Sequence, residues 1–287
     1  EVRNGVQDIG GGITTVLGMV VAEVLGRPLA EVRVLVGEST LGASVGSGGS
    51  QTTSSVAPAA RNAAEAVKGQ LAELAARLLD RKSAGEITWG EDGSARAGSK
   101  SLSFAELCKK IDGEAIVATA TRPETYSSYP MRHPGGPFYQ IAGVQFAAVT
   151  VDTWTGVVKV PEIVAVHECG RVHNPLTTRS QINGGIMLGV GYALMEERIL
   201  DRGSGRMLNP NLESYKIAGA RDLPAVDIIL TEVHTGANST GAIGIGEPAT
   251  IPTAAAIACA IHHAIKRPIR TLPITPDAVL AALQGGA

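Results

Sequence analysis

One glutamate stands out because its neighbours are glycine, proline or apolar. Glu247 lies in "GAIGIGEPATIP", residues 241–252. Glutamate is rarely buried without a partner or a task. An apolar, glycine-lined surrounding removes water from a carboxylate and raises its pKa, which suits a general base near neutral pH. The open alternative is a structural glutamate that interacts with the dipole of a helix beginning at about residue 252.

Three segments place a glycine-rich turn before a helix. They are "DIGGGITT" (8–15), "GSGGSQTTSS" (46–55) and "GIGEPATIP" (244–252). Glycines let the backbone approach a ligand closely, and free amides at a helix N-terminus bind phosphate or another anion. Ser47 and Thr52 add hydroxyl groups. None of the segments matches a Walker A motif or a dinucleotide fingerprint, so the pattern indicates an anionic ligand without identifying it.

Composition limits the class of protein. The 287 residues are 44% apolar and 18% charged, which is typical of a globular chain with a substantial core. The formal net charge of -2 gives no electrostatic case for binding nucleic acid or an anionic membrane. No apolar run reaches the roughly 18 residues that a membrane span needs.

The residues that commonly bind metals lack the spacing of a metal site. Cys108, Cys169 and Cys259 lie far apart and are expected to be small buried thiols. We predict no metal held by protein side chains. Arg132 is either a substrate-loop residue or a solvated loop charge. The histidines considered and set aside as ligands are His133, His167, His173, His262 and His263.

The spacing of apolar residues and of turn signals predicts an α+β fold with mixed sheets and packed helices. A first lobe over 1–120 would carry the glycine-rich loops, and a second over 121–287 would carry a β-hairpin and the Glu247 loop. The expected helices span 13–25 (ended by Gly26), about 55–81, 103–111 (begun by Ser103), 174–197, 252–265 and 276–284. The expected strands are 31–36, "EITW", the hairpin arms "GVQFAAVTVD" and "GVVKVPEIVAVHE", and 225–233, with an ordered loop over 121–142.

The order of these segments resembles the molybdenum-binding subunit of the xanthine dehydrogenase/aldehyde oxidase family of molybdenum hydroxylases. The resemblance covers nearly the whole chain. Its most specific parts are the "NPLTTRSQINGG" stretch, which is similar to the family's Asn-Pro…Gln-x-x-Gly-Gly segment, and "GIGEPATIPTAAAIACAI", which is similar to its Gly-Glu-Pro signature. "QDIGGGITT" and "GSGGSQTTSS" resemble its two cofactor loops.

The resemblance implies a role for each of these segments. Glu247 falls on the family's catalytic base, which takes a proton while oxygen from water is added to an electron-poor carbon of an aldehyde or N-heterocycle. Gln181 falls on a glutamine that touches the pterin of the molybdenum–molybdopterin cofactor, which in some members is the cytosine dinucleotide form. The other residues that the resemblance assigns to cofactor binding are Gly10, Gly11, Gly12, Ser47, Gly48, Gly49, Ser50, Gln51, Thr52, Gly244, Ile245 and Gly246.

The resemblance also implies partners. The family's molybdenum subunit is much longer, so a further polypeptide segment should carry its N-terminal part, including a glutamine near the metal and an arginine near the substrate. The [2Fe–2S] clusters and FAD would sit on an iron–sulfur subunit and a FAD subunit, in the cytoplasm or alternatively the periplasm. Two other classes stay open: a non-catalytic paralogue that only binds a partner, and a phosphate- or nucleotide-binding module.

Overall fold

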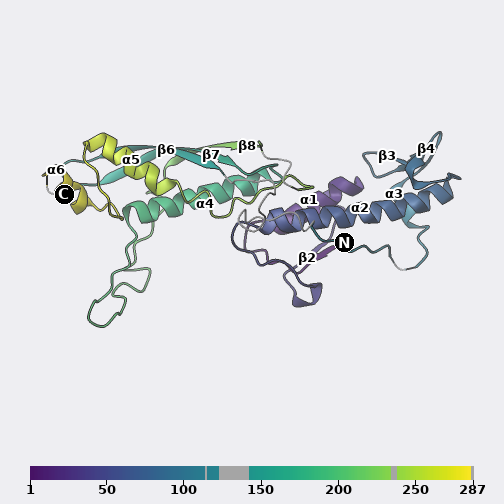
Figure 1. Cartoon of the computed structure of the whole chain (residues 1–287), viewed down its shortest axis with the longest axis horizontal. Helices are drawn as coiled ribbons and strands as arrows, with labels where there is room; N and C mark the ends of the chain where they lie inside the picture. Colours follow the sequence, from purple (N-terminus) through teal and green to yellow (C-terminus); the bar gives the residue numbers. More distant parts are fainter. Residues whose placement is uncertain (114, 123–141, 234–237, 286–287) are drawn as a thin grey trace, which may run out of the picture. The chain divides into compact units, whose positions relative to one another are not determined.

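The structure is a computed structural model that describes residues 1–113, 115–122, 142–233 and 238–285. The chain forms two compact units, and Figure 1 labels most of their helices and strands. The first contains Glu1–Tyr139, Gly170–Asn174 and His234–Gly244, and the second Gln140–Cys169, Pro175–Val233 and Ile245–Ala287. The lobe boundary at residue 120 remains a prediction. Arg132, His133 and most of the expected loop over 121–142 lie outside the described residues.

The first helix of the first unit has the predicted bounds. α1 spans Ile13–Leu25 and buries Ile13, Val16, Leu17, Val20, Val21 and Val24. It ends at Gly26, which adopts φ 62°, a left-handed conformation that suits glycine at a helix C-terminus. The expected strand 31–36 is shorter, because Leu29–Glu31 forms a 3-10 turn after Pro28. β2, Val34–Val36, pairs in parallel with β1, Val2–Asn4. β1 was not predicted, because three residues are too few to show the alternation of a strand.

The long helix α2, Thr52–Leu78, serves two hydrophobic clusters of the first unit. Its first half packs with α1 through Val56, Ala57, Ala60 and Ala64. Its second half packs with a small antiparallel sheet and α3, Phe104–Cys108, which Ser103 caps as predicted. That sheet has the order β3–β4–β5 and consists of Thr88–Trp89, Ala95–Ala97 and Lys100–Leu102.

The second unit contains the predicted hairpin. β6, Gly143–Val151, pairs antiparallel with β7, Val158–Glu168, and β8, Ala225–Thr231, adds in parallel to β7. The helices α4, Pro175–Leu194, α5, Thr253–Ile265, and α6, Pro276–Leu283, bury their apolar residues in one core with β7 and β8 (Figure 1). Among the described residues, no helix has the length and apolarity to cross a membrane.

Candidate cofactor loops and catalytic base

The first glycine-rich loop folds around the carboxylate of Asp8. One oxygen of Asp8 accepts from the amides of Gly10 and Gly12, each at 3.1 Å. The other accepts from the amide of Thr14 at 3.0 Å and from its hydroxyl at 2.7 Å. Gly12, the N-cap of α1, offers no side chain, so Asp8 caps the helix instead. Sequence reasoning missed this role, although an aspartate two residues before a glycine run is a usable signal.

The second loop is tied to the residue just before Asp8. Ser47 donates its hydroxyl to the carbonyl oxygen of Gln7, and its amide donates to Oε1 of Gln7 at 3.1 Å. The loop then passes through Gly49 at φ 63° and Ser50 at φ 53°, two consecutive left-handed residues before α2. Such a conformation is uncommon for serine and is found most often where a loop has a specific task.

Gly244, the first residue of the third segment, lies against the second loop within the first unit. Gly244 is buried, and a Cβ atom added to it would lie 1.4 Å from the carbonyl oxygen of Ser50. Only glycine therefore allows the two backbones to approach this closely. Together with the Ser47–Gln7 contacts, this approach brings residues from all three predicted segments into the first unit.

Three glycines of these loops face open space. A Cβ added to Gly10, Gly11 or Gly48 would meet nothing within 4 Å. The backbone ladder of α2 begins with the bond from Ser55 to Gln51, and the Gln51 side chain does not cap the helix. The first amides of α2 therefore have no acceptor within the helix. Open glycines beside helix-start amides, hydroxyls and close backbones fit a large anionic cofactor.

Glu247 lies in the second unit, on the turn that leads into α5. Its side chain is exposed, so the expected burial of this carboxylate is wrong. The apolar neighbours explain the difference, because Ala249 packs into the core while the turn directs Glu247 outward. The turn is closed by a hydrogen bond from the amide of Thr250 to the carbonyl of Glu247, at 3.0 Å. An exposed carboxylate on a closed turn can accept a proton from a bound substrate or from water.

Gln181 reaches the same turn from α4. Its Nε2 donates to the carbonyl oxygen of Gly246 at 2.7 Å, next to Glu247. Ile245 and Gly246 are both half-buried. The second unit thus brings together Gln181, Ile245, Gly246 and the predicted base, while the first brings together the glycine loops.

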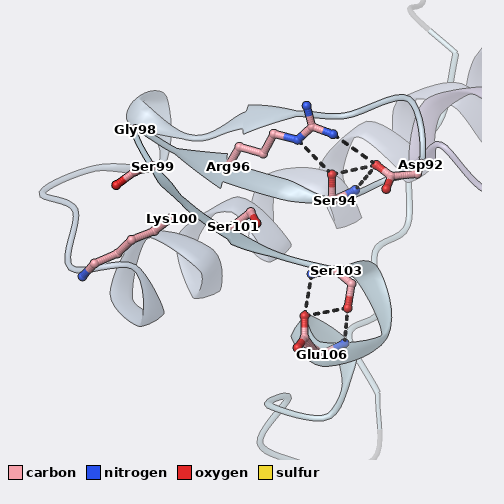
Figure 2. Close-up of a pocket in the computed structure, with 9 residues that line it drawn as sticks. All are labelled: Asp92, Ser94, Arg96, Gly98, Ser99, Lys100, Ser101, Ser103 and Glu106. Atoms are coloured by element: carbon pink, nitrogen blue, oxygen red, sulfur yellow. Dashed lines mark hydrogen bonds and ion pairs between the residues drawn. The ribbon is translucent and has the colours of Figure 1, made fainter.

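A polar hollow of about 460 Å³ lies elsewhere in the first unit, beside β4, β5 and α3 (Figure 2). Its charged side chains already have partners within the unit: Arg96 with Asp92, Lys100 with Asp80, and Glu106 with Ser103. None of the predicted site residues lines it. We therefore assign the candidate site to the loops. Among the described residues, no group of three or more His, Cys, Asp or Glu could hold a metal ion.

Asp8 should make the stability of the first unit depend on pH. Burial would raise its pKa, but the hydrogen bonds from Thr14, Gly12 and Gly10 outweigh this and hold the pKa below its usual value. Because the pKa of Asp8 is lower in the folded state, its contribution to the free energy of unfolding is complete above the unfolded-state pKa of 3.8. This contribution is lost as the pH falls through the folded-state pKa. Asp8→Ala should lower the free energy of unfolding by about 1–2 kcal/mol at pH 7.

Thermal unfolding of the Asp8→Ala and wild-type proteins, from pH 7 to the lowest pH at which the wild type stays folded, measures this effect. The difference in unfolding free energy between the two proteins should be constant near neutral pH and should become smaller at the acid end of the range. Equal stability of the two proteins at pH 7 would contradict the capping role.

Comparison with known proteins shows which family the chain belongs to. Residues 1–224 match the family model described as the molybdopterin cofactor-binding domain. The chain belongs to the molybdenum hydroxylase family. The family and the α+β fold class predicted from the sequence are therefore confirmed.

Relatives in this family are named as molybdenum-binding subunits. The chain is 31% identical to the xanthine dehydrogenase molybdenum-binding subunit of Escherichia coli O157:H7, covering 96% of this chain and 36% of that protein. It is also 31% identical to the aldehyde oxidoreductase molybdenum-binding subunit PaoC of Escherichia coli K12, covering 98% of this chain and 37% of PaoC. Quinoline 2-oxidoreductase from Pseudomonas putida 86 has a similar fold, with a TM-score of 0.80 and 26% identity over 97% of this chain.

This molybdenum hydroxylase chain spans little more than a third of the length of these relatives. The share is 36% for the xanthine dehydrogenase subunit and also 36% for quinoline 2-oxidoreductase. The family therefore fixes the fold and the kind of cofactor-binding domain, whereas the reaction of the whole protein is a separate matter.

Proposed function

We propose that this chain is the part of a molybdenum hydroxylase that helps hold the molybdenum–molybdopterin cofactor and carries the catalytic base. The observation that supports this most is the match of residues 1–224 to a molybdopterin cofactor-binding domain. The residues that would act on the cofactor are Gly10–Gly12, the loop from Ser47 to Thr52, Gln181 and the turn at Glu247. When bound, the cofactor supplies a two-electron acceptor.

The residues of this chain have distinct tasks in that proposal. The open glycines and the first amides of α2 would bind the anionic and polar edges of the cofactor, including its cytosine dinucleotide form. Glu247 would take the proton of the attacking oxygen that derives from water. The substrate would be an aldehyde or an N-heterocycle, whose electron-poor carbon gains that oxygen.

Other polypeptide would complete the enzyme. We infer that the N-terminal part of the molybdenum subunit covers apolar side chains that this chain exposes. On β6 and β8 of the second unit, Val144, Phe146 and Ile229 are 46%, 65% and 46% exposed. Patches of this kind commonly mark interfaces. The electrons would pass to [2Fe–2S] clusters and FAD on an iron–sulfur subunit and a FAD subunit.

Oxidation without molecular oxygen tests the proposed reaction. The purified complex should oxidise at least one of three probes, benzaldehyde, hypoxanthine or quinoline, under argon with a dye as electron acceptor. The product should be 16 mass units heavier than the probe, because in a hydroxylation without O2 the added oxygen atom can come only from water. A strict requirement for O2, or no oxidation of any probe by a complex that contains molybdenum, would contradict the proposal.

A further inference from the structure

A buried amide on β6 contacts the turn that carries Glu247. Gln145 is only 6% exposed, and its side chain points toward α5 within the second unit. Its Nε2 donates to the carbonyl oxygen of Ala249 at 2.8 Å, two residues after Glu247. Its Oε1 accepts from the hydroxyl of Thr253, the first residue of α5, at 2.7 Å. A carbonyl can only accept, so the orientation of the Gln145 amide is fixed by Ala249.

The second hydrogen of the Gln145 amide faces a buried histidine. Nε2 of His167 lies 3.2 Å from Nε2 of Gln145. Since Gln145 donates there, His167 accepts at Nε2 and carries its proton on Nδ1. His167 is fully buried, and this burial holds its pKa below the usual value, which favours the neutral imidazole. Every polar atom of the Gln145 side chain is therefore hydrogen-bonded, which favours a single orientation of its amide.

Two glycines of α4 let the turn lie close to the helix. A Cβ on Gly185 would come within 2.8 Å of Cβ of Ala249, and a Cβ on Gly189 within 2.3 Å of Cβ of Thr253. Gln181, one helical turn before Gly185, donates to the carbonyl of Gly246. The backbone is thus held on both sides of Glu247, by Gln181 before it and by Gln145 after it.

We propose that Gln145 is a positioning residue for Glu247: by binding Ala249 and Thr253 it fixes the backbone turn from which the exposed carboxylate projects. The carboxylate itself needs to be accessible to take a proton, so its own side chain cannot be locked by burial. Anchoring the neighbouring carbonyls gives it a defined position without covering it. The catalytic meaning of this anchoring rests on the proposed function of Glu247, but the anchoring itself does not.

Hydrogen exchange of the turn tests the anchoring directly in the whole complex. Gln145→Met keeps the size of the side chain and removes all three hydrogen bonds. It should speed the exchange of amides over residues 247–253 about tenfold. The three bonds stabilise the closed form of the turn, and their loss should raise the population of the open form by about that factor. The matched control is Asn209→Leu, which removes another buried amide of the second unit, bonded to Ile199 and Glu197. That variant should leave exchange of the turn unchanged.

Turnover with the best of the three probes tests the consequence for Glu247. Gln145→Met should lower kcat about tenfold and change KM by less than about twofold, with normal molybdenum content. In a Glu247→Gln background, the same substitution should have no further effect on any residual turnover, because there is no base left to position. Asn209→Leu should leave kcat within about twofold of wild type.

The outcomes separate the two proposals. Unchanged exchange in Gln145→Met, or equal acceleration in Asn209→Leu, would overturn the positioning role whatever the reaction is. If Gln145→Met fails to fold, Thr253→Val removes one of the three Gln145 bonds, together with the weaker 3.3 Å contact from the Thr253 hydroxyl to the Ala249 carbonyl. It should show a smaller acceleration in the same amides. Faster exchange with unchanged kcat would overturn the link to catalysis. An active Glu247→Gln variant would overturn the role of Glu247 as the base, and with it that link, but not the anchoring of the turn.

Discussion

Replacing Glu247 by glutamine should lower turnover by about a thousandfold or more while leaving molybdenum content and stability unchanged. Glutamine has nearly the same size and fits the same exposed position at the end of the turn. The amide accepts no proton at working pH, so only the base is lost. The loss should appear in kcat and in kcat/KM alike, as expected for an interaction made only in the transition state.

A control glutamate in the same unit separates this effect from a general loss of charge. Glu213 is also exposed, and Glu213→Gln should keep turnover within about twofold of wild type. Steady-state rates per molybdenum atom provide the comparison. Turnover of Glu247→Gln within about tenfold of wild type would show that Glu247 is not the base.

The second large effect is expected at Gly244, where the cofactor loop and the segment before Glu247 approach each other within the first unit. In Gly244→Ala, the new methyl group would lie 1.4 Å from the carbonyl oxygen of Ser50 and 2.5 Å from its carbonyl carbon. Both neighbours are backbone atoms, so the loop itself must move. We expect the unfolding free energy to fall by at least about 3 kcal/mol and molybdenum content to fall with it.

Gly48→Ala is the matched control for this effect. Gly48 lies in the same loop, but its added methyl group would meet nothing within 4 Å. Its thermal midpoint should therefore stay within about 2 °C of wild type, whereas that of Gly244→Ala should fall by about 10 °C. If Gly48 lines the cofactor as proposed, molybdenum content should drop in this variant without loss of stability. Equal midpoints for the two variants would refute the close approach at Gly244.

Local signals in the sequence predicted the helices and the hairpin well. Gly26 marks the end of α1, Ser103 marks the start of α3, and the alternating run after residue 143 forms β6. These elements depend on residues a few positions apart, which a sequence shows directly. The strands β1, β4 and β5 were missed because each has only three residues, too few for a period of two to appear.

The contacts that build the site depend on distant residues and could not be predicted in the same way. The approach of Gly244 to Ser50 and the bond from Gln145 to Ala249 join segments about 100 residues or more apart. The exposure of Glu247 is also a tertiary property. Its apolar neighbours in the sequence suggest burial, but in the folded turn Ala249 is buried and Glu247 is exposed. Resemblance to the family supplied the candidate residues, and the structure supplied the contacts that hold them.

Molybdenum analysis of the complex purified through a tag on this chain tests the central claim most directly. We expect about one molybdenum atom and one molybdopterin per copy of this chain. A chain or segment carrying the rest of the subunit should accompany it, with iron and FAD on further chains. Gly244→Ala should lose both molybdenum and stability, whereas Gly48→Ala should lose molybdenum alone. A folded complex that contains neither molybdenum nor pterin would contradict the proposed function. It would favour the alternative that this chain is a non-catalytic paralogue that only binds a partner.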